Sequence, residues 1–384
     1  MAAISPGSPS ALRTLNRSRV LEVLAAGSDV HQAELARMTG LAPATVSNIV
    51  RELHDDGMVT TVRSGRRTSV RLVRRSGYVV GIDVGHRHIG VAVADTDGTI
   101  LGEDFRQLDD PVTASNTLRR GRQILDGLFA RTGVDAEDIT AIGVGIPAPV
   151  DRAGFVGSPT ILPGWVGAHA ADLVGAELGV DAPVTVANDA NLGALAEHRF
   201  GVGVGTQNMA YVKVGAGVGA GLIVDGRLLT GANGTAGEIG HNCYDEYGEV
   251  CRCGNRGCLE TLVAAPQVVS LLTATHGVAT LDELVHRATA GDRPSVRVLQ
   301  DTGRQIGRAM ADLCNLINPE LIVIGGELAR AHEVLLPSIE MIIARTAVPA
   351  AASDLRLSVA RFEGRAQLIG AVAIAVDCVS VMFK

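Results

Sequence analysis

The sequence predicts a small helix-turn-helix domain with a β-hairpin, followed by two α/β lobes of similar design. The first 75 residues show helical periodicity and then two alternating segments. Beyond them, a strand, glycine turn and strand occur twice, and each copy is followed by strands alternating with helices. Residues 1–75 hold 11 Arg against 6 acidic residues, while 76–384 hold 23 basic against 35 acidic residues. A basic head on an acidic body is typical of a DNA-binding module joined to a small-molecule domain.

The composition is that of an ordinary globular chain. Hydrophobic residues make up 47% and aromatic residues 3% of 384 positions, which favours two or three domains with aliphatic cores. The longest apolar runs, such as 141–150, are too short and too rich in Gly and Pro to span a bilayer. Nothing at the N-terminus resembles a signal peptide, so we expect a cytoplasmic protein without a membrane partner. Residues 1–13, rich in Ser, Pro and Ala, are expected to form a disordered tail.

Residues 14–75 are predicted to be the DNA-binding domain. A first helix is expected around 20–24 and a second over 32–39, where Gly40 ends it, and Pro43 opens a third. In the third helix Val46, Ile49, Val50 and Leu53 repeat at helical spacing. The opposite face carries the polar side chains that we expect to contact DNA in the major groove, namely Thr45, Ser47, Asn48 and Arg51.

A hairpin is predicted after Gly57. Two alternating strands flank Ser64-Gly65, with Arg66 and Arg67 at the tip, and such a wing reaches phosphates or the minor groove. Arg51 suits a guanine edge and Asn48 an adenine edge. The alternative for this domain is a winged helix used for protein contacts only.

The two lobes follow a short polar joint at 74–77. Each begins with a glycine-containing hairpin and an Asp-Gly turn, first from 77 and again at 210–228. We assign 76–190 to the first lobe and 191–364 to the second. A nearly all-apolar helix at 365–384 is expected to complete the first lobe or to lie at a subunit interface.

Polar residues follow the predicted buried strand at 184–187. Asn188 and Asp189 stand where open α/β sheets place ligand contacts, at the carboxyl end of a strand. An amide and a carboxylate there can bind sugar hydroxyls, and Asp189 can take a hydroxyl proton in phosphoryl transfer. A helix N-cap is the structural alternative for either residue.

The stretch from 231 to 260 concentrates candidate metal ligands. His241, Cys251, Cys253 and Cys258 are one imidazole and three thiols, the donor set of a tetrahedral structural Zn²⁺ site in the metal loop 241–258. Cys243 can replace His241 in that set. Disulfides and reduced, packing cysteines are the alternatives, and a reducing compartment favours the metal.

These motifs resemble those of the ROK family of sugar kinases and sugar-responsive repressors. The resemblance rests on Asn188-Asp189-Ala-Asn191, on Glu238-Ile-Gly-His241, and on the cysteine loop up to Glu260, and it runs from about Tyr78 to the end. It implies a two-lobed actin-like (ribonuclease H-like) fold in which structural zinc braces a sugar pocket. The resemblance also implies which residues bind the sugar: Asn188, Asp189, Glu238, His241 and Glu260. Asp189 matches the general base of the kinases.

The sequence departs from the kinase pattern at both phosphate loops. The kinases carry Asp-X-Gly-Gly-Thr in the first loop, whereas here His86-Arg87-His88 follows Asp83-Val-Gly85. The second loop reads Gly215-Ala216-Gly217 without the usual threonine, and Glu327 follows a glycine pair.

We therefore expect a sugar-responsive transcriptional regulator, most simply a repressor, acting as a homodimer or homotetramer on operator DNA. The alternative is an ATP-dependent sugar kinase with Asp189 as base and Mg-ATP as phosphoryl donor. A zinc-dependent interaction module is a third reading, which leaves the polar residues around Glu238 and Glu260 without a role.

Overall fold

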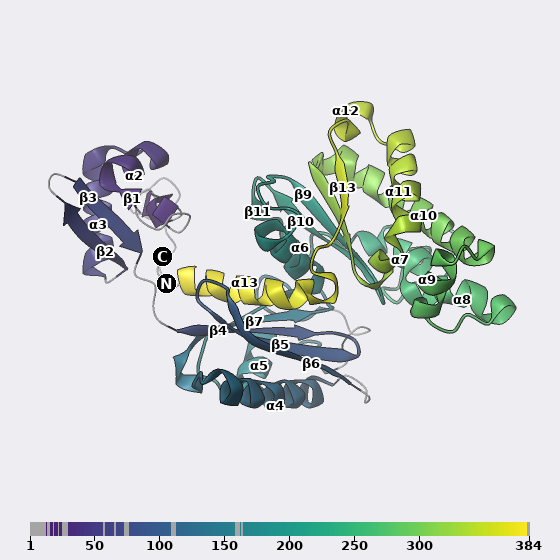
Figure 1. Cartoon of the computed structure of the whole chain (residues 1–384), viewed down its shortest axis with the longest axis horizontal. Helices are drawn as coiled ribbons and strands as arrows, with labels where there is room; N and C mark the ends of the chain where they lie inside the picture. The colour runs from purple at the N-terminus through teal and green to yellow at the C-terminus, as the bar shows by residue number, and fades with distance from the viewer. Residues whose placement is uncertain are drawn as a thin grey trace. The chain divides into compact units, whose positions relative to one another are not determined.

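The structure is a computed structural model. It describes residues 13, 16–17, 19–21, 23–24, 30–56, 58–64, 67–72, 77–108, 113–157, 162 and 164–381, with the backbone alone at 63–64, 67, 72 and 380–381. The chain divides into two compact units, 1–77 with 377–384 and 78–376. Figure 1 labels the elements of both units.

The N-terminal unit contains a helix-turn-helix and a winged sheet. Its helices are α2 (Gln32–Thr39) and α3 (Pro43–Asp55), and Gly40 ends α2 with φ 69°. The antiparallel sheet has the order β1-β3-β2, with the strands β1 (Val30–His31), β2 (Val59–Ser64) and β3 (Arg67–Leu72). The second and third predicted helices and the hairpin are confirmed, and the helix expected around 20–24 falls partly outside the described residues. The two-residue β1 was not predicted, because its pairing with β3 is a long-range contact with no local pattern.

A five-stranded sheet forms the first lobe of the larger unit, in the order β6-β5-β4-β7-β8. β5 lies antiparallel between β6 and β4, while β7 and β8 continue the sheet in parallel. The strands are β4 (Tyr78–Val84), β5 (His88–Asp95), β6 (Ile100–Gln107), β7 (Ile139–Ile146) and β8 (Val184–Asn188). The short 3-10 helix η1 (Ala136–Asp138) precedes β7, and the lobe also contains α4 (Ala114–Thr132) and α5 (Ala170–Leu178).

The second lobe repeats this sheet. Its order is β11-β10-β9-β12-β13, again an antiparallel meander of three strands extended by two parallel strands. The strands are β9 (Met209–Val214), β10 (Val218–Val224), β11 (Arg227–Leu228), β12 (Leu321–Gly325) and β13 (Arg356–Val359). The same strand order in both sheets confirms the prediction of two related lobes.

Helices cover both faces of each sheet (Figure 1). Alternate residues of β9 point to opposite sides of the sheet. Val212 packs into a core with residues of α10 (Arg293–Ile317), and Tyr211 packs into a core with residues of α6 (Asp189–Phe200) and α13 (Ala366–Val381). The remaining elements are α6 (Asp189–Phe200), η2 (Ile239–His241), α7 (Leu259–Val263), α8 (Ala265–His276), α9 (Leu281–Thr289), α10 (Arg293–Ile317), η3 (Glu327–Ala331), α11 (His332–Thr346), α12 (Pro349–Ala352), η4 (Glu363–Arg365) and α13 (Ala366–Val381). α10 begins at Arg293, because the side chain of Asp292 accepts the backbone N–H of Ser295 and caps the helix.

The first-lobe sheet meets α13 closely at two glycines. A Cβ added at Gly81 would lie 2.6 Å from Val372 Cγ2, and one at Gly143 would lie 2.0 Å from the carbonyl oxygen of Ala371. The absence of side chains at these two strand positions lets α13 pack on β4 and β7. This contact places α13 against the sheet of the first lobe.

Among the described residues, no single helix has both the length and the apolar composition to cross a bilayer. The bent pair α8 and α9 meets these two criteria only when its helices are taken together.

Candidate functional site

The candidate DNA face is the outer side of α3. Val46, Ile49, Val50 and Leu53 are at most 4% exposed and pack in the core of the N-terminal unit. On the other side, Asn48 and Arg51 are exposed, and Thr45 and Ser47 are half-buried. The buried stripe therefore turns all four predicted contact residues away from the core. Arg66 lies outside the described residues, and Arg67 is described by its backbone in β3.

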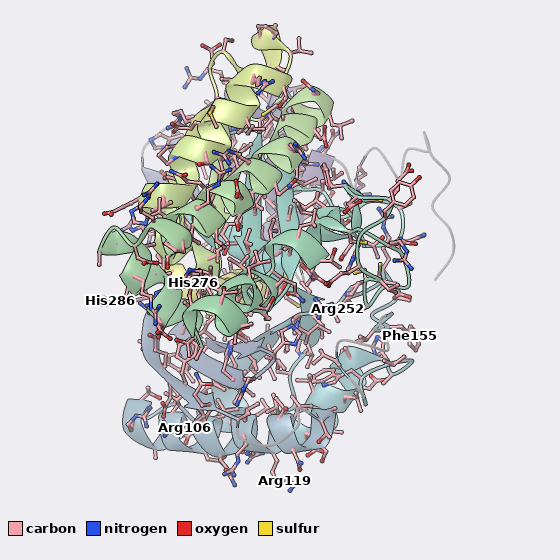
Figure 2. The ribbon with its side chains drawn as sticks, turned by 90° about the vertical axis from the view of Figure 1, so that its right-hand side faces the viewer. Arg106, Arg119, Phe155, Arg252, His276 and His286 are labelled. Carbon is pink, nitrogen blue, oxygen red and sulfur yellow. The ribbon has the colours of Figure 1, made fainter. Side chains whose placement is uncertain are left out.

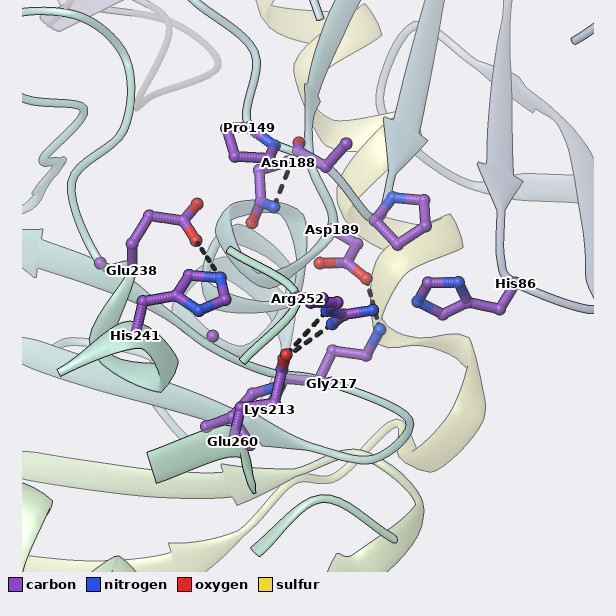
Figure 3. A pocket seen from close by; sticks show the side chains of 15 residues that line it. His86, Pro149, Asn188, Asp189, Lys213, Gly217, Glu238, His241, Arg252 and Glu260 are labelled. Carbon is purple, nitrogen blue, oxygen red and sulfur yellow. Dashed lines mark hydrogen bonds and ion pairs between the residues drawn. The ribbon is translucent and has the colours of Figure 1, made fainter. Parts of the chain in front are cut away.

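The candidate effector pocket has about 480 Å³ of empty volume, including the open space at its mouth, and contains all five predicted sugar contacts (Figure 3). Both lobes contribute: the first supplies the ends of β7 and β8, and the second supplies β9, β10 and the segment around η2. The lining residues are His86, Pro147, Ala148, Pro149, Asn188, Asp189, Lys213, Gly217, Val218, Gly219, Gly237, Glu238, His241, Arg252 and Glu260.

Asn188 is the N-cap of α6. Its Oδ1 accepts hydrogen bonds from the backbone N–H groups of Ala190 and Asn191, at 2.9 Å and 3.4 Å. Its Nδ2 donates to the carbonyl oxygen of Ala148 at 3.3 Å. Asn188 therefore has the helix-capping role that was given above as its structural alternative. Both the oxygen and the nitrogen of its side-chain amide already make hydrogen bonds within the protein.

Asp189 is ion-paired with Lys213. The ammonium Nζ of Lys213 donates to Oδ2 of Asp189, and the two side chains are 26% and 11% exposed. Burial favours the neutral amine of Lys213, but the charge of Asp189 and the hydrogen bond to it outweigh burial, so the pKa of Lys213 is raised. Asp189, which is the general base in the kinase alternative, is therefore already ion-paired with Lys213.

Glu260 makes a bidentate ion pair with Arg252. Nε and Nη2 of Arg252 donate to Oε1 and Oε2, each at 2.7 Å, and the backbone N–H of Val218 donates to Oε2 at 3.0 Å. Glu260 is 6% exposed. Figure 2 shows Arg252 at the level where the two lobes face each other, far from Arg119 on α4. A carboxylate whose two oxygens both accept hydrogen bonds from an arginine is held in a fixed position.

Glu238 and His241 lie at the other end of the pocket. The distance between Nε2 of His241 and Oε2 of Glu238 is 3.8 Å. Burial raises the pKa of Glu238 to about 7, and the negative charges of Asp189 and Glu260 act in the same direction. Glu238 is therefore protonated more readily than an exposed glutamate, and a protonated carboxyl group can donate as well as accept hydrogen bonds.

The first glycine loop is filled by its own histidines. Nε2 of His88 lies 3.0 Å from Oδ2 of the buried Asp83. A Cβ added at Gly85 would lie 2.1 Å from Cε1 of His88, so the imidazole ring covers this glycine. His86 lines the pocket; burial lowers the pKa of His86, and the charges of Lys213 and Arg252 lower it further. The side chains of His86 and His88 thus occupy the space in which a bound phosphate would have to approach the backbone.

The second glycine loop is approached by charged side chains. A Cβ added at Gly217 would lie 2.6 Å from Nη2 of Arg252 and 2.9 Å from Oε2 of Glu260, so a side chain here would have to displace the end of Arg252. Near Gly215, a Cβ would lie 3.7 Å from Oε2 of Glu327. This carboxylate adds negative charge to the side of the loop where a nucleotide phosphate would bind.

The candidate metal centre joins the pocket through His241. The ligand atoms of His241, Cys251, Cys253 and Cys258 all lie within 4.8 Å of one another, so this group could hold a metal ion. Nδ1 of His241 faces Sγ of Cys251 at 3.6 Å, and the other ring nitrogen faces Glu238. The four-residue group includes His241, and Cys243 is exposed and outside it.

The cluster does not form a disulfide. Sγ of Cys253 lies 3.7 Å from Sγ of Cys258, whereas a disulfide bond measures about 2.05 Å. Burial raises the pKa of Cys258 to about 12, and the neighbouring thiols add to this effect. A cation bound between the sulfurs would reverse this preference and stabilise the thiolates.

Sequence reasoning missed Lys213, Arg252 and His86 as pocket residues. Lys213 is one of only two lysines among 384 residues, and it lies in the β9 strand beside the second glycine loop, which was an available signal. Arg252 stands between two predicted metal ligands, so the motif was noticed but the arginine was not. His86 was interpreted only as an obstacle to phosphate binding.

The matches to family models divide the chain between residues 67 and 79, where the structure also separates its two units. A model of the ROK family matches residues 79–377, and a model of the MarR family matches residues 13–67. The xylose repressor of Caldicellulosiruptor bescii is 26% identical, over 97% of this chain and 98% of its own length. The DNA-binding transcriptional dual regulator NagC of Escherichia coli is 29% identical, over 96% of this chain and 94% of its own length.

Solved structures resemble the chain to different extents. A ROK family transcriptional regulator, a homologue of the Escherichia coli MLC protein, matches with a TM-score of 0.80 and 27% identity over 97% of this chain and 98% of its own. A ROK family glucokinase from Streptomyces griseus, in complex with glucose and AMPPNP, matches with a TM-score of 0.70 and 27% identity over 78% of this chain and 100% of its own. The regulator therefore accounts for a larger part of the chain than the kinase does.

Proposed function

This chain belongs to the ROK family, and we propose that it is a sugar-responsive transcriptional repressor of that family. The observation that carries the proposal is α3, which turns Thr45, Ser47, Asn48 and Arg51 away from its buried stripe. A helix with such a face after a helix-turn is the element that enters the DNA major groove. We propose that Arg66 and Arg67 in the wing contact the DNA backbone.

The state of the phosphate loops supports a regulator over a kinase. Phosphoryl transfer needs an open cradle for the phosphates and a base free to take the hydroxyl proton. Here the His88 ring covers Gly85, Glu327 lies near Gly215, and Lys213 is bound to Asp189. These features leave the sugar side of the pocket intact and disfavour the nucleotide side.

We propose that the effector sugar binds at Asn188, Asp189, Glu238, His241 and Glu260, as the family resemblance implies. Sugar binding would draw the two lobes together and change the spacing of the DNA-binding units in a homodimer or homotetramer. Two DNA-binding units with a changed spacing could no longer bind at the same time to two operator half-sites that lie one or more helical turns apart. In a cytoplasmic repressor, this change releases the operator when the sugar is present.

We propose further that the metal centre holds structural Zn²⁺. With Zn–S near 2.3 Å and Zn–N near 2.05 Å, a tetrahedron separates two sulfurs by about 3.8 Å and a sulfur from a nitrogen by about 3.6 Å. The corresponding distances are 3.7 Å for Cys253 to Cys258 and 3.6 Å for Cys251 to His241. The ion would fix the imidazole of His241 in the pocket wall and leave the chemistry to other groups.

The same proposal includes the domain limits. They are 14–75 for the DNA-binding domain, 76–190 with 365–384 for the first lobe, and 191–364 for the second lobe. Limited proteolysis followed by mass spectrometry of the fragments checks them, because linkers between folded domains are cut first.

Selection of operator DNA from a random library, followed by binding measurements on variants, tests the DNA-binding role. We expect Arg51→Ala and Asn48→Ala each to weaken specific binding by about 10- to 100-fold, the usual effect of losing a base contact. Arg37→Ala is the control, because Arg37 is an exposed arginine of α2 that pairs with Glu34. Selection of no sequence, or equal losses in all three variants, would refute the proposed role of α3.

A kinase remains the competing function, and ADP release separates the two. We expect no turnover above background with Mg-ATP and a panel of hexoses. Sugar-dependent turnover that disappears in Asp189→Asn would instead assign the base role to Asp189.

A further inference from the structure

Cys243 lies in the metal loop 241–258 but outside the group of residues that could hold a metal ion. Its side chain is exposed, whereas Cys258 is 0% exposed. An exposed thiol contributes nothing to a hydrophobic core and is open to attack by small oxidants. Neither packing nor the metal group therefore accounts for a cysteine at this position.

The backbone pairs Cys243 directly with Cys258 in an antiparallel bridge. On one side of the pair, the N–H of Tyr244 donates to the carbonyl oxygen of Gly257 at 2.8 Å. On the other side, the N–H of Leu259 donates to the carbonyl oxygen of the residue before Cys243, at 2.9 Å. These flanking bonds make the two cysteines a non-hydrogen-bonded pair, whose side chains lie on the same face with Cα atoms about 4.5 Å apart. A disulfide joins Cα atoms about 4.4–6.8 Å apart, so the pair is within its reach.

Gly257 fixes the register of this pairing. It has φ 63°, and a Cβ added there would lie 1.5 Å from the carbonyl oxygen of Asp245. Its own carbonyl oxygen accepts a second bond, from the N–H of Asp245 at 3.2 Å, and its N–H donates to the carbonyl oxygen of Glu249 at 2.8 Å. The two segments can approach this closely only at a glycine. The alignment of Cys243 with Cys258 is therefore set by the backbone and not by the rotamer of either side chain.

We propose that Cys243 and Cys258 form a reversible disulfide when the chain meets a hydroperoxide, so that the metal loop is also a redox-responsive site. The inference goes beyond the sugar response. Its consequence for the metal rests on the proposed Zn²⁺ site, because Cys258 belongs to the group that would hold the ion.

The reaction with hydrogen peroxide takes place in two steps. The O–O bond breaks, one oxygen atom goes to Sγ of Cys243 and the other leaves as water, which gives a sulfenic acid. Sγ of Cys258 then attacks that sulfur, the S–S bond forms and the S–O bond breaks. The departing hydroxide takes up a proton and leaves as a second water. The two cysteines together lose one electron pair, which the peroxide gains, and a thiol reductant restores both thiols by exchange.

The competing disulfide joins Cys253 to Cys258, whose sulfurs lie 3.7 Å apart. Both of these residues belong to the metal group, and a sulfur bound to a metal is less available to an oxidant than a free thiol. Cys243 lies outside that group and is exposed, so we expect peroxide to oxidise it first. The cysteine opposite it in the backbone pair is Cys258, which therefore resolves the sulfenic acid.

The disulfide would change the wall of the effector pocket. Cys258 immediately precedes α7, which carries Glu260, and Glu260 is bonded to Arg252. A sulfur used in the disulfide can no longer hold a metal ion, and His241 would then lose the ion that fixes its ring in the pocket. Oxidation of one exposed cysteine would thus reach three residues that line the pocket.

Peptide mapping of the full chain after treatment with hydrogen peroxide tests the inference. Free thiols are alkylated, and the unreduced protein is digested with trypsin and a glutamate-specific protease. Cleavage after Glu246, Glu249, Arg252 and Arg256 places each cysteine of the loop on a separate peptide. We expect mass spectrometry to find the Cys243 peptide linked to the Cys258 peptide, and the link to disappear with dithiothreitol. A link between Cys253 and Cys258 instead, or Cys243 oxidised without a partner, would overturn the inference.

A chromogenic chelator measures the consequence for the metal. In Cys243→Ser we expect peroxide to release Zn²⁺ at least about fivefold more slowly than in the parent protein, because the free thiol that starts the reaction is gone. Cys378→Ser is the matched control, since Cys378 is a partly buried cysteine outside the loop, and it should release the metal at the parent rate. Equal release rates in all three proteins would show that the metal is lost by another route.

Failure of the inference and failure of the proposed function give different results. The peptide map decides the disulfide whether or not the purified chain contains zinc. A Cys243–Cys258 link in a chain without bound metal would refute the proposed Zn²⁺ site and leave the redox pair standing. A zinc-loaded chain in which this link never forms would refute the redox pair and leave the metal site standing.

Discussion

The β4–β5 turn and the β9–β10 turn occupy equivalent positions in two sheets of the same strand order, yet they have different contents. The first turn is filled from within, because His88 covers Gly85 and bonds to Asp83. The second keeps Gly217 bare so that the ion pair of Arg252 and Glu260 can approach it. Repetition of a fold therefore does not repeat its chemistry: one turn closes a phosphate cradle, and the other supports a ligand pocket.

The largest expected effect comes from disrupting the proposed metal centre, whose loop carries Arg252. Cys258→Ser should abolish metal binding and destabilise the chain by roughly 4 kcal/mol, since loss of a structural metal belongs to the most damaging changes. Arg252 lies between two ligands of this centre, so its pairing with Glu260 should be lost as well. Metal content by mass spectrometry and thermal melting check this prediction.

The exposed Cys243 provides the matched control. Cys243→Ser should keep the metal and the melting temperature. Equal metal content in Cys258→Ser and the parent protein would contradict the assigned ligand set.

A smaller effect is expected at the first turn. In Gly85→Ala the new methyl group displaces the His88 ring from Asp83, and we expect a loss of about 1–2 kcal/mol from crowding. Adding His88→Ala should recover part of this loss, because it removes the colliding ring. Chemical denaturation of the single and double variants measures both effects.

Gly175 in α5 serves as the control glycine, since nothing lies within 4 Å of a Cβ built there. Gly175→Ala should leave the stability unchanged or raise it by up to about 1 kcal/mol. If the double variant at 85 and 88 were less stable than Gly85→Ala alone, the His88 ring would not be the source of crowding.

Changing Gly217 should affect binding more than stability. In Gly217→Ala the methyl group meets the flexible end of Arg252, which can move away at little cost in folding free energy. The displaced guanidinium no longer faces the ligand, so we expect effector affinity to fall about tenfold while the melting temperature changes little. Calorimetry with the tightest ligand of the parent protein measures this effect, and unchanged affinity would separate Arg252 from the effector.

The smallest predicted effect depends on pH. The hydrogen bond to Asp83 raises the pKa of His88 in the folded chain. A group with a raised folded-state pKa contributes its stability fully below its unfolded value, about 6.5, and loses that contribution as the pH rises through the folded value. His88→Gln should therefore cost more stability at about pH 5.5 than at about pH 8, by less than about 1 kcal/mol because the side chain is partly exposed.

His276→Gln, a substitution of an exposed histidine at the end of α8, is the control for general effects of losing a histidine. A cost for His88→Gln that grew toward high pH would reverse the predicted sign. Melting temperatures of the three proteins across this pH range decide between the two directions.

The sequence contained the elements of the fold but only part of the site. Local signals sufficed for α2, α3, the hairpins and the repeated lobes, because turns and side-chain periodicity are properties of neighbouring residues. β1 was missed, since two residues that pair with β3 have no pattern of their own. The four residues that could hold a metal ion were predicted together, because a cysteine loop has a spacing that few other structures require.

The ion pairs of the pocket could not be predicted from spacing. Lys213 and Asp189 come from different elements, 24 residues apart, and nothing in either stretch indicates that they meet. Because Lys213 pairs with Asp189, we interpret Asp189 as a carboxylate whose charge is neutralised by a partner and not as a free base. The roles of the five sugar contacts and of the DNA contacts remain predictions, since they concern ligands rather than the fold.

The central claim is that one chain couples sugar binding to release of DNA, and fluorescence anisotropy tests it most directly. A labelled operator from the random-library selection is titrated with the full chain, with and without the tightest sugar ligand found by calorimetry. The account predicts tight, sequence-specific binding that weakens at least about tenfold when the sugar is added, and weaker binding by Arg51→Ala already in the absence of sugar. Specific DNA binding that is unaffected by every sugar that binds the chain would contradict it.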